Sequence, residues 1–213
     1  RAAELFEART AEFTSLIAKE AGRTLNDGLD EVREAVDFCR YYAAQATSLM
    51  HSELELPGIT GETNRLSYAP RGPWLCISPW NFPLAIFTGQ IVANLAVGNT
   101  VVAKPAEQTP LVARLACDVL EEAGVPEGVI NLVNGDGPTL GGWLLPDERI
   151  AGVSFTGSHP SALVINRQLA LRDGPIIPFI AETGGINCMI VDSTALPEQV
   201  VDDVITCLLY TSD

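Results

Sequence analysis

The side chains of this 213-residue sequence that are suited to chemistry gather in short loops that follow apolar runs. The first such loop reads Ser78-Pro79-Trp80-Asn81-Phe82-Pro83. Two prolines restrict the backbone around Asn81, and a preorganised side-chain amide is the kind of donor that stabilises a developing oxyanion. A rigid Pro-aromatic turn with a structural Asn explains the same residues, and the motif taken alone favours that second interpretation.

A lysine and a glutamate follow the second apolar run, in Lys104-Pro105-Ala106-Glu107-Gln108-Thr109-Pro110. Lys104 is one of only two lysines in the chain. Its ammonium can donate to one hydroxyl of a ribose, while the Glu107 carboxylate accepts from the other. An exposed ion pair before a helix, with Thr109 as the cap and Pro110 as the first residue, is an equally good interpretation.

Glycine-containing loops follow the third and fourth apolar runs. The third loop, Asn134-Gly135-Asp136-Gly137-Pro138, continues to Gly141 as G-x-G-x-x-x-G, which is looser than the dinucleotide fingerprint, and a flexible turn explains it as well. The fourth, Phe155-Thr156-Gly157-Ser158, leads into a helix whose first amides, with the Ser158 hydroxyl, would bind a pyrophosphate. A plain Ser158 N-cap is the alternative.

A carboxylate ends the fifth apolar run, in Ala181-Glu182-Thr183-Gly184-Gly185. The adjacent Gly184 permits close approach of another group to the backbone. A half-buried Glu182 would have a raised pKa and would suit general-base catalysis. A solvated glutamate at a strand end is the alternative.

The order of apolar and helical segments predicts how these loops are positioned. Strands are expected at 73–78, 100–104, 129–133, 151–156, 176–181 and 186–191. Helices are expected near 84–97, 110–123, 138–145, 161–171 and from about Leu196. This alternation predicts an α/β, Rossmann-like open parallel sheet with crossover helices on both faces. Because ligands bind at the carboxyl ends of such strands, all five loops should meet at one edge.

The N-terminal part has a different pattern, which predicts a boundary near residue 72. Residues 1–50 are expected to form two helices, separated at Gly22 and Asn26-Asp27-Gly28, with a buried stripe of Val32, Val36, Cys39, Ala43 and Ala46. An extended crossing segment should complete residues 1–72, and the Rossmann-like domain should occupy 73–206. Residues 207–213 break the helical pattern before them and are interpreted as a foreign junction.

Composition excludes several classes of function. The net charge of −14 argues against nucleic acid as a partner, and no apolar stretch is long enough to span a membrane. Two histidines and five cysteines without a CxxC pair give no zinc-type spacing. Four cysteines have apolar neighbours and are expected in the core, namely Cys39, Cys76, Cys117 and Cys188. The odd cysteine count and the absence of a signal-peptide pattern predict a cytoplasmic protein.

Taken together and in this order, the motifs PWNFP, KPAE, FTGS and E-x-GG resemble the aldehyde dehydrogenase superfamily, up to about Thr206. Two longer stretches are more similar to the L-glutamate γ-semialdehyde (Δ1-pyrroline-5-carboxylate) dehydrogenase domain of bifunctional proline utilisation proteins. They are EVREAVDFCRYYAAQA at 31–46 and PFIAETGGINCMIVDSTALPEQVVDDVI at 178–205.

The resemblance implies a role for each loop. Asn81 would be the oxyanion-hole amide, and Glu182 would activate the hydrolytic water. The adenosine ribose of NAD would be held by Lys104 and Glu107. The remaining cofactor contacts would come from Trp80 and Ser158 at the pyrophosphate, and from Ile77, Ser78, Gly137, Gly157 and Gly184 close to the cofactor.

The implied mechanism is attack of a cysteine thiolate on the aldehyde, hydride transfer to the nicotinamide and hydrolysis of the thioester. Glu107 should repel a 2′-phosphate and so favour NAD over NADP. The sequence departs from the family at His159-Pro160-Ser161, where a Thr-Glu pair is usual, which leaves the contacts there open.

The resemblance also implies that the sequence is a fragment. The nucleophilic cysteine is expected a few residues beyond Asp213, so the catalytic domain would be absent and the fragment inactive. The parent enzyme would be a homo-oligomer acting on a small aldehyde, and FAD would be needed only if a proline dehydrogenase domain preceded Arg1. A non-catalytic nucleotide-binding module and an aldehyde dehydrogenase of another substrate class remain as alternatives.

Overall fold

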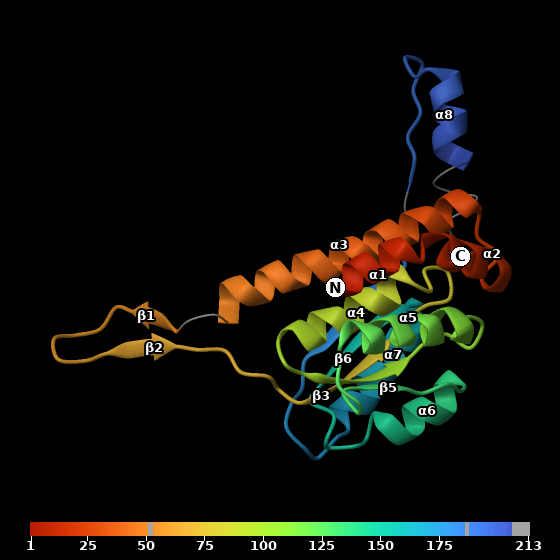
Figure 1. Cartoon of the computed structure of the whole chain (residues 1–213). Coiled ribbons are helices and arrows are strands. Elements are labelled where there is room, and N and C mark those ends of the chain that lie inside the picture. The colour runs from red at the N-terminus through yellow and green to blue at the C-terminus, as the bar shows by residue number, and fades with distance from the viewer. Residues whose placement is uncertain (51–52, 186–187, 206–213) are drawn as a thin grey trace.

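Short apolar runs that each lead into a helix form a parallel sheet, because the helix returns the chain to the edge from which the strand began. The computed structural model describes residues 1–50, 53–185 and 188–205. Within these residues the sheet has the strand order β5-β4-β3-β6-β7, and every neighbouring pair is parallel (Figure 1). The strands are β3 (Pro73–Ile77), β4 (Thr100–Lys104), β5 (Ile130–Leu132), β6 (Gly152–Gly157) and β7 (Phe179–Thr183). The predicted open parallel sheet is confirmed.

Each face of the sheet is covered by its own hydrophobic core. Side chains alternate along β3, so Trp74 and Cys76 enter one core and Leu75 enters the other. The first core is formed with α4 (Ala85–Ala96) and α5 (Pro110–Ala123). The second is formed with α7 (His159–Ala170) and the residues around the end of α6 (Gly137–Leu144).

An N-terminal layer of helices packs over α4 and α5 and enlarges the first core (Figure 1). It consists of α1 (Ala2–Ala8), α2 (Thr10–Glu20) and α3 (Leu25–Met50), where two helices were predicted. The predicted break at Gly22 is confirmed, since this residue has a φ of +69°. The predicted break at residues 26–28 is wrong because Asp27 completes a capping box: its backbone N–H donates to Thr24 Oγ1 at 3.1 Å, and its carboxylate accepts from Thr24 N.

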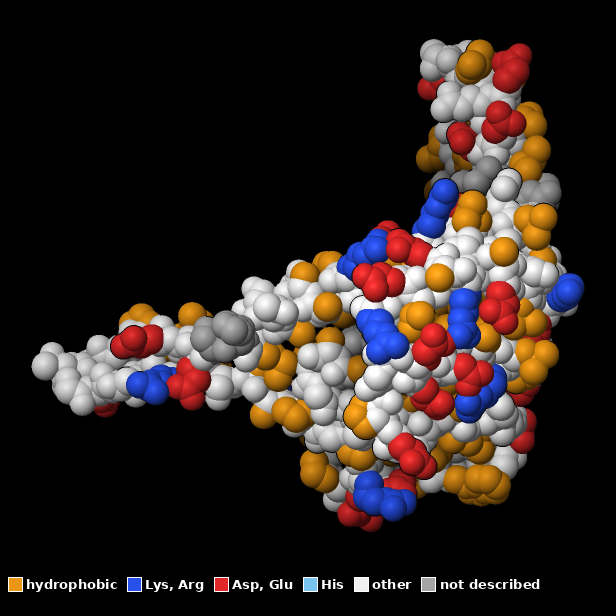
Figure 2. Space-filling model, viewed as in Figure 1, with side chains coloured by type: hydrophobic (Ala, Val, Ile, Leu, Met, Phe, Trp, Pro, Cys, Tyr) orange, Lys and Arg blue, Asp and Glu red, His pale blue; other side chains and the backbone are white. Residues whose placement is uncertain are grey.

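The far end of α3 leaves the body of the molecule and forms an arm together with a small hairpin (Figures 1 and 2). Val32 and Val36 of the predicted stripe are buried, but Ala43 is exposed on this outer half of the helix. The predicted extended crossing contains the antiparallel pair β1 (Leu54–Leu56) and β2 (Asn64–Leu66). The arm carries exposed apolar side chains, including Tyr41, Leu49, Leu54, Ile59 and Tyr68.

The last part of the chain differs most from the prediction. The final strand begins at Phe179 and not at residue 176, because Pro178 has no N–H to donate to a ladder. Of the strand predicted at 186–191, the described residues 188–191 are irregular and exposed, and 186–187 lie outside the described residues, as do 207–213. The predicted helix near Leu196 is confirmed as α8 (Pro197–Val204), none of whose described residues is buried.

In the described ranges no helix combines the length and the apolar composition needed to cross a membrane.

Close packing of α3 on α4 gives a first prediction. A Cβ added at Gly89 of α4 would lie 2.8 Å from Cδ2 of Phe38 on α3, so Gly89→Ala must displace the Phe38 ring or one of the two helices. We expect a loss of about 1–3 kcal/mol in the free energy of unfolding, as for other overpacked cores. Gly142→Ala in α6 is the control, because nothing lies within 4 Å of its added Cβ. Alanine should stabilise that helix by up to about 1 kcal/mol. Equal unfolding midpoints in urea for the two variants would contradict this packing.

Candidate functional site

The carboxyl ends of the parallel strands lie at one edge of the sheet, as predicted. In the register, Ile77 pairs with Lys104 on one side and with Phe155 on the other, and Thr156 pairs with Glu182. From β3 the chain first builds outward through β4 and β5, and then returns to add β6 and β7 on the other side. The strand order therefore reverses between β3 and β6, which is where doubly wound sheets bind ligands.

Gln90 of α4 joins the two strands on either side of this reversal. Its Nε2 donates to the carbonyl oxygen of Ile77 at 3.2 Å and to Thr156 Oγ1 at 3.1 Å. Sequence reasoning missed Gln90, although a glutamine within the apolar helix 84–97 was a usable signal. Its Oε1 and the Oγ of the 5% exposed Ser78 are buried without a hydrogen-bond partner among the described residues. Unpaired buried oxygens of this kind need an explanation, and a bound ligand supplies one.

Lys104 and Glu107 form an ion pair between a buried ammonium and a partly exposed carboxylate. Lys104 Nζ, with a side chain only 7% exposed, donates to the carbonyl oxygen of Pro105 at 3.0 Å and to Glu107 Oε1 at 3.2 Å. The same Glu107 oxygen accepts from Gly137 N at 2.7 Å, which ties this loop to the glycine-containing loop before α6. The fully exposed ion pair considered from the sequence is therefore wrong for Lys104.

Glu107 stays ionised at neutral pH. Partial burial acts to raise the pKa of its carboxyl, but hydrogen bonds from its own backbone N–H, Lys104 and Gly137 outweigh that effect and hold the pKa below its ordinary value. An ionised, partly exposed carboxylate beside a buried ammonium can accept from one hydroxyl while the ammonium donates to another.

The N-terminal layer supplies acceptors to the first turns of two crossover helices. Glu20 of α2 accepts from Leu111 N and Val112 N of α5 at 2.9 and 2.8 Å. Thr109 occupies the N-cap position of α5, but its side chain makes no capping bond to the described residues, so its predicted capping role is wrong. The acceptor comes instead from a helix 90 residues earlier in the chain, which no local pattern reveals.

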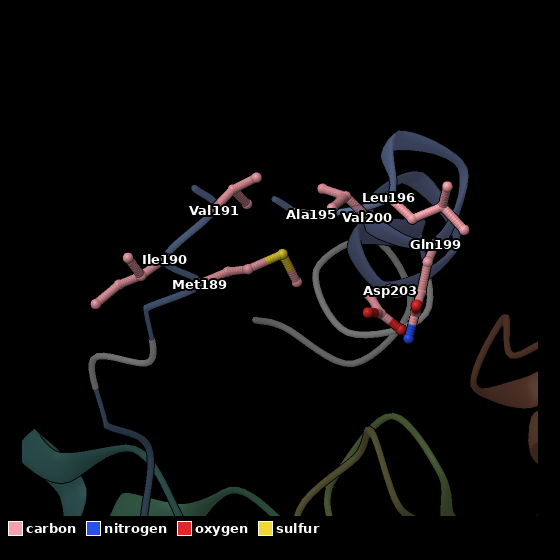
Figure 3. A pocket seen from close by; sticks show the side chains of 8 residues that line it. All are labelled: Met189, Ile190, Val191, Ala195, Leu196, Gln199, Val200 and Asp203. Carbon is pink, nitrogen blue, oxygen red and sulfur yellow. The ribbon is translucent and has the colours of Figure 1, made fainter. Parts of the chain in front are cut away.

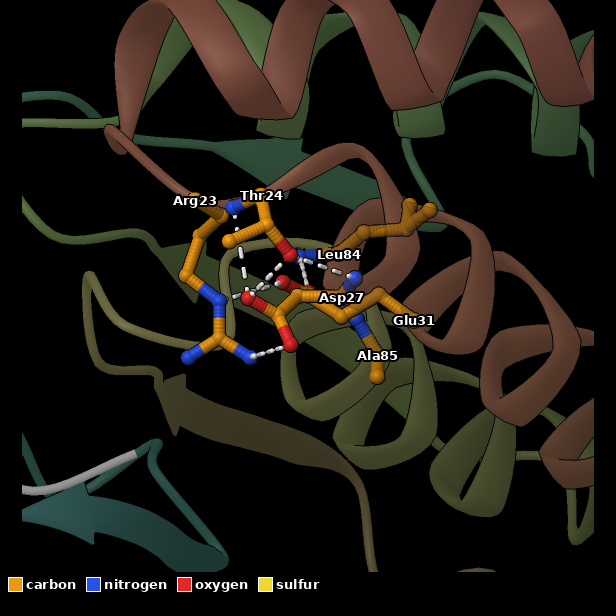
Figure 4. A network of polar contacts seen from close by, with 6 residues as sticks. All are labelled: Arg23, Thr24, Asp27, Glu31, Leu84 and Ala85. Carbon is orange, nitrogen blue, oxygen red and sulfur yellow. Dashed lines mark hydrogen bonds and ion pairs between the residues drawn. The ribbon is translucent and has the colours of Figure 1, made fainter. Parts of the chain in front are cut away.

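Glu31 of α3 accepts from the first turn of α4, the helix that follows the Asn81 loop (Figure 4). Its Oε2 accepts from Leu84 N at 2.9 Å and from Ala85 N at 3.2 Å. Arg23 packs over the ring of Phe82 in this loop, with 4.6 Å from the guanidinium carbon to the ring centroid. Sequence reasoning did not single out either Arg23 or Glu31.

The first turn of α7 differs from those of α4, α5 and α6, because among the described residues no carboxylate accepts from it. Ser158 caps the helix, since its Oγ accepts from Ser161 N at 3.3 Å. An added Cβ at Gly157 would lie 2.8 Å from Cζ at the far end of the Phe155 side chain, so glycine here lets that ring lie close to the loop. The N-cap interpretation of Ser158 is therefore confirmed, and anion binding by this loop stays a prediction.

Several predicted site residues face solvent at this edge. Trp80 is 42% exposed and Asn81 is half-buried in its loop. Glu182 and Gly184 are exposed, and nothing described lies within 4 Å of a Cβ added at Gly184. The half-buried Glu182 expected from the sequence is therefore wrong, because β7 is the edge strand and its last residues are left open by the described part of the chain.

A pocket of about 270 Å³ lies elsewhere, between the segment after β7 and α8 (Figure 3). Its lining contains no predicted site residue and consists of Met189, Ile190, Val191, Ala195, Leu196, Gln199, Val200 and Asp203. In Figure 1, α8 stands away from the sheet, so this pocket is separate from the strand ends. The described residues also include no group of three side chains that could hold a metal ion.

Three of the cysteines are poor nucleophiles. Burial raises the pKa of the Cys76 and Cys117 thiols to about 12 and that of Cys39 to about 11, so all three are neutral at physiological pH. The prediction of core cysteines is confirmed for the buried Cys76 and Cys117, whereas Cys39 is half-buried. It is wrong for Cys188, which is exposed. Cys207 lies outside the described residues.

Comparison with known proteins gives curated relatives of much greater length. The bifunctional protein PutA of Escherichia coli K12 is 52% identical over 208 residues, which are 96% of this chain and 15% of the relative. The 1-pyrroline-5-carboxylate dehydrogenase of Anoxybacillus flavithermus is 40% identical over 208 residues, or 40% of its length. The chain thus spans a minor part of the proteins it matches.

Comparison with solved structures gives proteins of the same two names. A proline utilization A (PutA) structure with proline bound in remote sites superposes with a TM-score of 0.92 at 60% identity, covering 96% of this chain and 21% of the other. The 1-pyrroline-5-carboxylate dehydrogenase from Thermus with bound NAD gives 0.82 at 39% identity, covering 87% and 36%. The aldehyde dehydrogenase family matches residues 1–212. The chain belongs to the aldehyde dehydrogenase family.

Proposed function

We propose that this chain is the cofactor-binding part of an NAD-dependent aldehyde dehydrogenase that oxidises L-glutamate γ-semialdehyde to glutamate in proline catabolism. The observation that carries the cofactor-binding part of the proposal is the distribution of carboxylates over the crossover helices. Glu31, Glu20 and Glu107 occupy the first turns of α4, α5 and α6, and α7 at the strand reversal is left for an anionic ligand.

The residues at this edge fit NAD. Lys104 and Glu107 would hold the adenosine ribose, and the first turn of α7 with Ser158 would hold the pyrophosphate against Trp80. Ile77, Ser78, Gly137, Gly157 and Gly184 would lie along the cofactor. When bound, NAD supplies the hydride acceptor for the oxidation. The ionised Glu107 disfavours the additional 2′-phosphate of NADP, because like charges repel.

Two further residues at the edge would act on the substrate. The Asn81 amide would donate to the oxygen of the aldehyde as negative charge develops on it. Glu182, which is exposed at the end of β7, would take a proton from the water that hydrolyses the thioester. The nucleophile would be a cysteine other than Cys39, Cys76 and Cys117, whose thiols are neutral.

The substrate class rests on the relatives, which are named PutA and 1-pyrroline-5-carboxylate dehydrogenase. The chain spans 15% and 40% of them, and we propose that other parts of the enzyme bind the substrate's carboxylate. We place the enzyme in the cytoplasm as a homo-oligomer. A flavin would take part only if a proline dehydrogenase domain preceded Arg1.

The ribose assignment can be tested with Glu107→Gln in an active aldehyde dehydrogenase that carries this segment. The amide accepts a hydroxyl less strongly and no longer repels a phosphate, so we expect NAD to bind roughly tenfold more weakly and its advantage over NADP to narrow. Dissociation constants for both cofactors measure this. Glu127→Gln, an exposed glutamate in the loop between α5 and β5, is the control. Unchanged constants for both cofactors in Glu107→Gln would refute the assignment.

The role of Glu182 can be separated from hydride transfer by transient kinetics. In the same enzyme, Glu182→Gln should keep the initial burst of NADH but lower steady turnover by roughly a hundredfold or more, because only hydrolysis requires the base. Stopped-flow absorbance resolves the two phases, with Glu198→Gln on the exposed face of α8 as the control. An equal loss of the burst would assign Glu182 to an earlier step.

The 213-residue chain by itself should oxidise no aldehyde. Thioester chemistry needs an activated thiolate, and burial keeps the thiols of Cys39, Cys76 and Cys117 neutral. Purified chain, NAD and glutamate semialdehyde should therefore give no NADH, whereas a longer relative does so under the same conditions. NADH formation by the chain would overturn this, and its loss in Cys188→Ser or in Cys207→Ser would identify the nucleophile.

A further inference from the structure

The loop that carries Asn81 is held at its carboxyl end by a side chain from another layer of the molecule. Glu31 is 1% exposed and lies between α3 and α4. Its Oε2 accepts from Leu84 N and Ala85 N, and Leu84 directly follows the last proline of the loop (Figure 4). These two bonds fix the backbone three residues after Asn81.

Arg23 links the same carboxylate to the middle of the loop. Its Nε is 4.0 Å from Glu31 Oε1, and its guanidinium lies over the ring of Phe82, the residue next to Asn81. The Arg23 side chain is 7% exposed, and Asp27 approaches the other side of the guanidinium at 3.9 Å. The capping box at Thr24 and Asp27 starts α3 at this point, so the helix itself places Arg23 and Glu31.

Burial of the Glu31 carboxylate costs free energy, because the charged group loses its contact with water. Burial raises the pKa of its carboxyl to about 7, although the bonds from Leu84 and Ala85 and the charge of Arg23 oppose this shift, while Glu34 adds to it. A helix start is normally capped by a short polar side chain of its own, but the N-cap of α4 is Leu84, which has none. Stability of α4 is thus obtained at a desolvation cost that a local Ser, Thr or Asp would avoid. What the distant carboxylate adds is a fixed relation between α3 and the loop.

We propose that Glu31, with Arg23 as its partner, is a positioning residue for Asn81 that holds the Pro79–Pro83 loop so that the Asn81 amide is preorganised as the oxyanion donor. The catalytic part of this inference rests on the proposed function. Preorganised donors are effective because they need no rearrangement in the transition state, and that depends on the residues that support them.

Glu20 provides a contrast within the same molecule. It also accepts two backbone N–H groups at the start of a crossover helix, but that helix, α5, follows the Lys104–Glu107 loop. Loss of Glu20 should therefore weaken NAD binding, whereas loss of Glu31 should slow the chemical step. A merely structural role would affect both properties alike in both variants.

The first arm of the test measures the loop itself, independently of any activity. Hydrogen–deuterium exchange of the 213-residue chain would be compared for wild type, Glu31→Ala, Glu31→Gln and Asp37→Ala. Asp37 is the matched control because it is an exposed carboxylate further along α3 that does not act on the Glu31 carboxyl. In Glu31→Ala, the amides of Leu84, Ala85 and the loop should exchange roughly tenfold faster or more, because their acceptor is lost. Glu31→Gln keeps an acceptor oxygen and should exchange at a rate close to that of wild type.

The second arm measures catalysis in an active aldehyde dehydrogenase that carries this segment. Glu31→Ala should lower the burst rate by roughly tenfold to a hundredfold with an unchanged dissociation constant for NAD. Glu31→Gln should recover most of that loss, and Glu20→Ala should raise the NAD constant while keeping the burst rate at saturating NAD.

Each outcome decides the inference. Unchanged exchange at Leu84 and Ala85 in Glu31→Ala would overturn the positioning of the loop. Faster exchange with an unaltered burst rate, or equal losses of NAD binding and burst rate in both alanine variants, would overturn the link to Asn81. If the longer enzyme that carries this segment oxidises no aldehyde, the proposed function is refuted and with it the catalytic part alone, while the exchange data would still decide the loop.

Discussion

The unpaired N–H groups at the start of each crossover helix are the constraint on which the site depends. They must find acceptors when the first turn is buried, and α4 and α5 find them in Glu31 and Glu20 of the N-terminal layer. Each carboxylate also benefits from the positive end of the helix dipole. The N-terminal helices therefore do more than cover a hydrophobic face, because their carboxylates also accept from the helix starts that directly follow two of the loops.

The same need for acceptors determines which helix starts at the sheet could bind an anionic ligand. A helix start that is filled by a protein carboxylate cannot also accept a phosphate, because the two anions would compete for the same donors. With Glu31, Glu20 and Glu107 in place at α4, α5 and α6, the first turn of α7 is the one without a protein carboxylate among the crossover helices described. It starts beside the reversal of strand order, where Gln90 joins the ends of β3 and β6.

The open side of the site has a physical consequence for Glu182. The residue is exposed, because β7 is the edge strand and no other part of the described chain packs over its end. By contrast, hydrogen bonds hold the pKa of Glu107 below its ordinary value, and burial raises the pKa of Glu31. The surroundings of Glu107 and Glu31 are thus formed by the described residues, whereas nothing in the described part of the chain buries Glu182.

The sequence by itself determined the parallel sheet, the order of its elements and the loops at its carboxyl edge, because apolar periodicity and turn residues are local signals. It also identified the family, through motifs such as PWNFP and FTGS whose order is specific. Only the tertiary structure decided which carboxylates meet which helices, since Glu20 and Glu31 act over 90 and 50 residues of chain. It likewise decided burial: Lys104 is enclosed and Glu182 is exposed, because exposure depends on which layers pack over a strand end and not on the residues within it.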